Sequence, residues 1–383
     1  MNQTEITFLQ AIQKSVWRKD VLFPADTDWS AIFKEAEDHT VLGFVFDAAP
    51  ADVQQERKKK ASRITANFVR ILHCQEQLYL LLKANDIPMA ILKGTAAAVY
   101  YPNPSLRSMG DIDYIVPAKD FDKAKTLLVA NRYMIKEDPE ALRHLHVYKD
   151  GIRYEQHWRF SGVGIDIERY VTDGLAHAEI ETMYGTEFPM LPRLVNGLVL
   201  LGHMAQHLNR RGLGLRQVID CMMYADRELD DEFWDLSFAE AARESGLETL
   251  AVVVTKMCQL YLGLTEEIHW CDTGDAKLCS ELMDYIVSSG NFSRKPGEGA
   301  IASKAISNMF QKGFFRYLQE AGKINWKACQ EHTWLRPFAW IYQICRYVKR
   351  GLHAKRSGDE LIQDLERGKL RSYLLDKLEI GQK

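Results

Sequence analysis

Two aspartates separated by one residue, Asp111 and Asp113, are the side chains in this sequence best suited to chemistry. They lie in the segment Gly110–Val116, whose apolar residues predict a β-strand. Side chains two apart on a strand point to the same face, so the two carboxylates would lie side by side. Adjacent carboxylates repel each other, and divalent metal binding is one good reason for the arrangement. The alternative is a strand end at the surface, where water solvates both acids.

A glycine-containing turn precedes the aspartate pair. The apolar run Ile87–Leu92 predicts a buried strand, and the small residues of Ala96–Tyr101 predict a short helix. Between them, Gly94 lets the backbone approach a phosphate closely, and Thr95 adds a hydroxyl. The N–H groups at the start of the helix would face the same phosphate. We therefore expect the turn to bind the β- and γ-phosphates of a nucleotide.

Lys93 and Arg107 flank this expected site and could neutralise phosphate oxygens. Arginine is well suited to this task because its planar guanidinium contacts two oxygens at once. The alternatives are a solvated or structural lysine at Lys93 and a salt bridge within a loop at Arg107.

A Gly-Thr turn, a short helix and Asp-x-Asp on a strand together resemble the signature of polymerase-beta-like nucleotidyltransferases. One branch is more similar, an uncharacterised bacterial nucleotidyltransferase family. The residues that match its pattern are Leu92, Lys93, Gly94, Tyr101, Pro102, Arg107, Gly110, Asp111, Ile112 and Asp113. Thr95 departs from the Gly or Ser that the superfamily usually has, and the gap to Asp111 is longer than usual. The resemblance covers most of the chain from about residue 60 to residue 350.

The resemblance implies a third metal-binding carboxylate on a later strand, and by motif position this residue is Glu155. The segment Glu155–Trp158 reads Glu-Gln-His-Trp, where the family tends to have an acid, an apolar residue, His and Trp. Gln156 departs from this pattern. Glutamate also replaces the usual aspartate, so its longer arm must fold back to reach the same metal.

Two other interpretations of the third acid remain open. Asp166 is a rival for the role, because it alternates with apolar residues on a predicted strand, Ile165–Tyr170. Alternatively, Glu155 is a hairpin acid paired with Arg153 or Arg159.

An enzyme of this family would use two Mg²⁺ ions to move a nucleotidyl group from a nucleoside triphosphate to an acceptor hydroxyl, releasing pyrophosphate. The residues that would hold the metal are Asp111, Asp113 and Glu155. The residues that would contact the nucleotide are Lys93, Gly94, Thr95 and Arg107. The Asp113–Glu155 side would also help to deprotonate the acceptor. One alternative is a catalytically inactive nucleotide-binding or partner-regulating protein on the same fold. Another is a helical interaction protein with an accidental aspartate pair.

The composition limits which acceptor class and which cellular compartment are expected. There are 49 basic and 52 acidic residues, a formal net charge of −3, which favours a small molecule or a protein as acceptor over nucleic acid. The 7 cysteines form no CxxC pair, as in reduced proteins of the cytoplasm. The first ten residues do not resemble a signal peptide. The apolar stretches are short and interrupted, so no membrane association is expected.

The expected fold class is α+β. A polymerase-beta-like α/β core with a mixed sheet would occupy residues 83–190, between a helical lead-in, 1–82, and a helical C-terminal domain, 191–383. Within the core, Asp150–Gly151 predicts a two-residue hairpin turn between two strands.

Four further histidines fall outside the expected site. His203 and His207 are four apart on a predicted helix and share one face, but no third zinc ligand is evident. We expect them to pack between helices or to touch the rim of the active site, with Asp220 pairing with one of them or with Arg216. His144 and His146 lie on a strand-like segment and are expected to have no special role.

Overall fold

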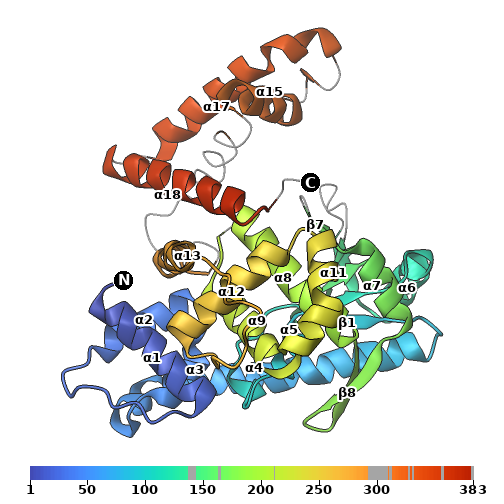
Figure 1. Ribbon diagram of the computed structural model, residues 1–383. Coiled ribbons are helices and arrows are strands. Elements are labelled where there is room, and N and C mark those ends of the chain that lie inside the picture. Colours follow the sequence, from blue (N-terminus) through green and yellow to red (C-terminus); the bar gives the residue numbers. More distant parts are fainter. Residues whose placement is uncertain are drawn as a thin grey trace.

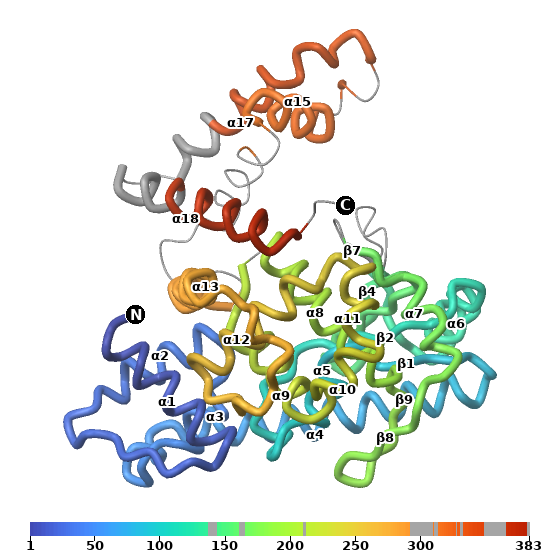
Figure 2. The backbone as a smooth tube through the Cα atoms, in the orientation of Figure 1, coloured from blue at the N-terminus to red at the C-terminus, as the bar shows by residue number. Residues whose placement is uncertain are grey.

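The computed structural model describes residues 1–136, 144–162, 165–210, 212–291, 309, 313–326, 328–329, 332–354 and 358–380; for 161–162, 210, 348–354 and 358–364 it describes the backbone alone. A mixed β-sheet lies in the main body of the molecule, with helices on both of its faces (Figure 1). A pair of C-terminal helices stands clear of that body (Figures 1 and 2).

Within the described residues, seven strands form one sheet in the order β3-β4-β5-β2-β1-β9-β8. These strands are β1 (Ala90–Leu92), β2 (Ile112–Ile115), β3 (Met134–Lys136), β4 (His144–Lys149), β5 (Ile152–His157), β8 (Glu179–Met183) and β9 (Thr186–Met190). Strand β2 is parallel to β5 and antiparallel to β1, so the sheet is mixed. The short strands β6 (Ser161–Gly162) and β7 (Ile165–Asp166) pair with each other. The α+β class is confirmed.

Two helices cover one face of the sheet through an apolar core. Helix α4 (Ala51–Lys83) contributes Phe68 and Leu72, and α6 (Phe121–Ala130) contributes Leu128. Alternate side chains of the strands fill the space between these helices and the sheet. They are Ile112 and Tyr114 of β2, Leu145 and Val147 of β4, and Ile152 and Tyr154 of β5. The period of two therefore assigns the remaining residues of these strands to the other face.

Three N-terminal helices precede α4, and the first two begin with a side-chain cap. They are α1 (Gln3–Trp17), α2 (Trp29–Asp38) and α3 (Leu42–Ala48). Asn2 and Glu5 form a capping box at the start of α1, and Asp28 accepts a hydrogen bond from the backbone of Ala31 in α2. Their apolar faces join the larger core with the helices that follow the sheet.

That larger core lies beyond the opposite face of the sheet and is built mainly from helices after β7, together with the short helix α5 (Gly94–Ala98). The helices after β7 are α7 (Glu168–Ala176), α8 (Arg193–Arg210), α9 (Leu215–Glu228), α10 (Asp231–Phe233), α11 (Ala239–Glu244), α12 (Glu248–Leu262) and α13 (Ala276–Ser289). A π-helical turn, η3 (Trp234–Phe238), joins α10 to α11, and 3₁₀ turns lie at η1 (Pro104–Leu106) and η2 (Ala118–Asp120). Gly197 lets α8 approach α9 closely, because a β-carbon there would meet the ring of Tyr224 at 2.4 Å.

The C-terminal segment has two parts. Helices α15 (Phe314–Asn325) and α17 (Ala339–Ala354) pack on each other across the 3₁₀ turn η4 (Thr333–Phe338) and stand clear of the body (Figure 1). Helix α18 (Gly358–Lys377) returns to pack on α13 and α8, where buried Arg371 donates to the carbonyl of Leu208. In the part of the chain that is described, no helix is both long and apolar enough to cross a membrane.

The predicted strand Ile165–Tyr170 is wrong beyond Asp166. Strand β7 ends at Asp166, and helix α7 begins at Glu168. Val171 and Leu175, four residues apart, are buried on this helix, so helical spacing takes over where the alternation of the strand ends.

Candidate active site

Strand β2 places Asp113 in the interior of the sheet, between β1 and β5. Its neighbours Ile112 and Tyr114 enter the core under α4 and α6, so Asp113 turns to the opposite face. Asp113 lies opposite Leu92 of β1 and opposite Glu155 of β5. Only 8% of its side chain is exposed, which makes a nearby cation necessary to stabilise the charge.

Glu155, and not Asp166, stands beside the aspartate pair. Because β5 runs parallel to β2 in register, Glu155 leaves the same face as Asp113. Asp166 is exposed on β7 and pairs across the small sheet with Ser161. The alternative pairing of Glu155 with Arg153 is also present in the structure, since Arg153 Nη2 lies 3.5 Å from Glu155 Oε1.

Two cations balance the carboxylates. Lys93 Nζ contacts Asp113 Oδ1 at 2.6 Å, and Arg153 donates to Asp111. Burial alone would lower the pKa of Lys93, but Asp113, Glu155 and Asp111 outweigh it and raise that pKa, so the ammonium stays charged. Lys93 is nearly buried, whereas 48% of the Arg153 side chain is exposed.

Asp113 and Glu155 have opposite pKa shifts. Burial would raise the pKa of Asp113, but the Lys93 ammonium and a hydrogen bond from His157 hold it below its usual value. For Glu155, burial and the neighbouring Asp113 carboxylate raise the pKa to about 8. Asp113 therefore favours its ionised form, and Glu155 is protonated more easily than a free glutamate.

Three histidines surround Glu155. None of them was assigned a role in the site from the sequence. His157 Nε2 lies 3.2 Å from Asp113 Oδ1 and 3.9 Å from Glu155 Oε2. His146 Nδ1 lies 3.6 Å from Glu155 Oε1, and the ring of His144 lies 5.2 Å from that of His157. The signal in the sequence is His-x-His on one strand opposite Glu-x-His on the next.

Metal-capable side chains form two groups among the described residues. One group is Asp113, Glu155 and His157, and the other is His144, His146 and Glu155. Within each group the ligand atoms lie within 4.8 Å of one another. Asp111 belongs to neither group; its carboxylate is turned to Arg153.

The turn between β1 and α5 presents backbone rather than side-chain donors. Lys93 and Gly94 have successive positive φ angles of 55° and 46°, a strained conformation that glycine tolerates and lysine rarely adopts. Thr95 is fully buried, and its hydroxyl donates to Gln75 of α4 at 2.5 Å. The threonine hydroxyl expected at a phosphate is thus engaged with the scaffold.

One known protein family matches more than half of the chain. The sequence model of a family described as "Uncharacterised nucleotidyltransferase" matches residues 25–263. The chain belongs to this family. No curated protein sequence matches it. Among solved structures, an antigenic nucleotidyltransferase-like protein from Paracoccidioides brasiliensis is similar, with 14% identity over 52% of this chain and 95% of that chain and a TM-score of 0.34. The family resemblance drawn from the sequence is therefore confirmed.

In this member of the nucleotidyltransferase family, Arg107 is buried and tied to helix α9. Its Nε and Nη2 atoms each donate to Asp220 at 2.7 Å, and Tyr101 donates to the same carboxylate at 2.6 Å. Burial opposes the charge on Arg107, but Asp220 outweighs it and raises the arginine's pKa. Asp220 therefore pairs with an arginine of the preceding loop, which differs from the expected histidine or Arg216. Arg216 instead donates to the carbonyl of Ser108.

The histidine pair of α8 lies near the candidate site, since His203 senses the charges of Lys93 and Asp113. His203 Nε2 and His207 Nε2 are 2.8 Å apart, so one ring donates to the other. Burial and the positive charge of Lys93 lower the pKa of His203, which keeps the ring neutral. Neither histidine belongs to a metal-capable group in the described part of the chain.

Proposed function

We propose that the protein is a magnesium-dependent nucleotidyltransferase that moves a nucleoside monophosphate from a nucleoside triphosphate to an acceptor hydroxyl and releases pyrophosphate. The observation that carries this proposal is the register of β2 against β5, which sets Glu155 beside Asp113 with Lys93 at the same carboxylate. Membership of the nucleotidyltransferase family supports the reaction class.

The donor set fits magnesium. Asp111, Asp113 and Glu155 offer carboxylate oxygens, which hard divalent cations prefer, and Asp113 and Glu155 already belong to one metal-capable group. Arg153, the cation on Asp111, is half-exposed and can leave without breaking the core. Two bound magnesium ions would polarise the reacting phosphate and lower the pKa of the acceptor hydroxyl.

The chain's own groups would complete the nucleotide site. In this proposal Lys93 and the backbone N–H groups of Gly94 and Thr95 contact the β- and γ-phosphates, since the turn adjoins Asp113. Arg107 acts through its ion pair with Asp220, holding the loop before β2 against α9. On the Asp113–Glu155 side, Glu155 would take the proton of the acceptor, because its raised pKa makes it the stronger base of the two.

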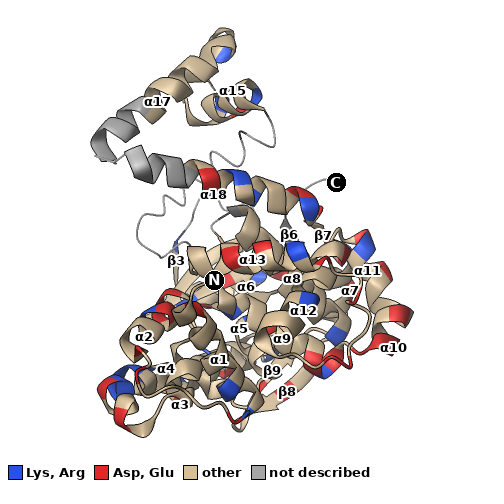
Figure 3. Cartoon of the chain, turned by 60° about the vertical axis from the view of Figure 1, so that its left-hand side comes forward, with Lys and Arg blue, Asp and Glu red and all other residues tan. Residues whose placement is uncertain are grey.

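The acceptor is proposed to be a small molecule or a protein side chain. Acidic and basic residues nearly balance in number, and Figure 3 shows both kinds mixed along the helices of the chain. A nucleic-acid acceptor would be favoured by an excess of basic residues, and the sequence has 49 basic against 52 acidic residues.

Calorimetry with ATP, GTP, CTP and UTP in the presence of Mg²⁺ tests the proposal. The wild type is expected to bind at least one triphosphate only with the metal, and the double variant Asp111→Asn/Asp113→Asn is expected to lose about 100-fold or more in affinity. Asp166→Asn is the matched control, because this exposed acid lies on the small sheet. A folded wild type that binds no triphosphate would refute the proposal.

One observation favours a second function, nucleotide binding without turnover. Lys93 and Arg153 already neutralise Asp113 and Asp111, so the site is balanced without metal. Incubation with α-labelled triphosphate and cell extract separates the two. Labelled product that depends on Mg²⁺ and on Asp113 indicates transfer, and binding without any labelled product in repeated extracts indicates the inactive alternative.

A further inference from the structure

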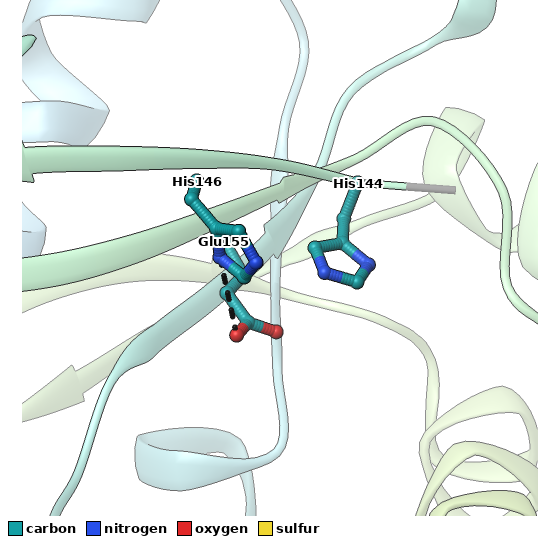
Figure 4. A group of neighbouring side chains, drawn as sticks. All are labelled: His144, His146 and Glu155. Carbon is teal, nitrogen blue, oxygen red and sulfur yellow. Dashed lines mark ion pairs between the residues drawn. The ribbon is translucent and has the colours of Figure 1, made fainter. Parts of the chain in front are cut away.

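A pair of histidines lies next to the carboxylates on the same face of the sheet. His144 and His146 are two residues apart on β4, so their rings leave one face of that strand. In the antiparallel pairing of β4 with β5, His146 stands opposite Glu155 and His144 opposite His157. Figure 4 shows both imidazole rings and the Glu155 carboxylate extending to the same side of their strands.

The three side chains are close enough to share one ion. One ligand atom from each of His144, His146 and Glu155 lies within 4.8 Å of the others, and His146 Nδ1 is 3.6 Å from Glu155 Oε1. In a tetrahedral shell, ligand atoms about 2.0–2.2 Å from the metal lie about 3.3–3.6 Å from one another. The His146–Glu155 pair is already at that spacing, and the remaining ligand atoms would need to move together by at most about 1.5 Å.

The donor set selects a kind of metal that differs from magnesium. Magnesium takes oxygen ligands, whereas imidazole nitrogens suit first-row transition ions such as Zn²⁺. Two histidines and one carboxylate also supply three protein ligands and leave a fourth position open. An ion pair with Glu155 alone would need only one imidazole, but His144 stacks edge-to-face on His146 with ring centres 4.8 Å apart.

We propose that His144, His146 and Glu155 form a binding site for a divalent transition-metal ion of the zinc class, adjacent to the Asp111–Asp113 pair. The side chains are partly buried, so they are shielded from bulk water yet reachable by an ion. Arg153 is 3.5 Å from Glu155 Oε1 and must withdraw, which its half-exposed side chain allows. The site shares Glu155 with the proposed function, but its occupancy does not depend on nucleotide turnover.

Cobalt binding tests this site, with Co²⁺ as a coloured probe for Zn²⁺. The full-length protein is stripped of metal and titrated with Co²⁺ in saturating Mg²⁺, and the visible absorption of the ion is followed. We expect one equivalent of Co²⁺ to bind, and His144→Ala and His146→Ala each to weaken it by about tenfold to 100-fold or more. His177→Ala, which removes an exposed histidine elsewhere, and Asp111→Asn are expected to bind Co²⁺ like the wild type.

Three results would overturn the site. They are no Co²⁺ binding by the wild type, equal binding by the double variant His144→Ala/His146→Ala, and loss of binding in Asp111→Asn while the histidine variants keep it. Circular dichroism checks that each variant is folded. X-ray absorption of the Zn²⁺-loaded wild type is independent of any variant and should show two imidazole ligands; an all-oxygen shell contradicts the proposal. Nucleotide calorimetry reports separately on the proposed function.

Discussion

The two faces of strands β2, β5 and β4 are completed in different ways. One face is covered by apolar packing, because Ile112, Tyr114 and Val147 pack directly under α4 and α6. The other face carries imidazoles and carboxylates, and Lys93 and Arg153 balance the charge of the carboxylates. The same strands supply both sets by alternation. The comparison suggests that the apolar face supports stability and leaves the polar face available for a ligand.

The largest effect on stability is expected from the apolar face. Ile112→Ala removes a side chain that is 2% exposed, and the lost burial and the cavity should cost about 2–5 kcal/mol in the free energy of unfolding. Denaturant titration measures the loss, with Ile180→Ala on edge strand β8 as the control, because Ile180 is 50% exposed. If both variants lose the same free energy of unfolding, the apolar face contributes no more to stability than the exposed edge strand does.

A smaller effect is expected where a polar group enters the apolar face. Gln156, the departure from the family pattern, is fully buried and accepts a hydrogen bond from Tyr114 at 2.8 Å. Tyr114→Phe leaves that oxygen without its donor and should cost about 1–3 kcal/mol. Adding Gln156→Leu should recover most of the loss, because no buried oxygen then needs a partner. Thermal and denaturant unfolding of both single variants and the double variant measure the coupling; additive losses would contradict the pairing.

Local patterns predicted the strands that carry the carboxylates but missed one hairpin. The Asp150–Gly151 turn between β4 and β5 is confirmed, since aspartate and glycine both adopt positive φ there. The hairpin of β8 and β9 was not foreseen. Its turn is Tyr184–Gly185, where tyrosine adopts an unusual φ of 51°, and β8 is mostly exposed. An edge strand with few buried residues gives little periodic signal.

Some residues of the candidate site could be identified from local sequence, and others only from contacts between distant segments. Asp111, Asp113 and Glu155 were found because each lies in a short motif, and their roles stay predictions. The grouping of His144 and His146 with Glu155 depends on the register of β4 against β5, which no single segment encodes. The Arg107–Asp220 pair spans 113 positions of sequence and appears only after α9 packs against the loop.

The smallest effect is expected at the exposed cation of the polar face. Arg153→Ala removes a half-exposed ion pair with Asp111, so the free energy of unfolding should change by no more than about 1 kcal/mol. If Arg153 occupies the carboxylates in the absence of metal, its removal should strengthen Mg²⁺-dependent triphosphate binding by up to about fivefold, the equivalent of that energy. Calorimetry measures the affinity, with exposed Arg159→Ala as the control. A weaker triphosphate affinity in Arg153→Ala, but not in Arg159→Ala, would mean that Arg153 contacts the phosphates. The charged groups of the polar face would then be balanced by the nucleotide as well as by the metal.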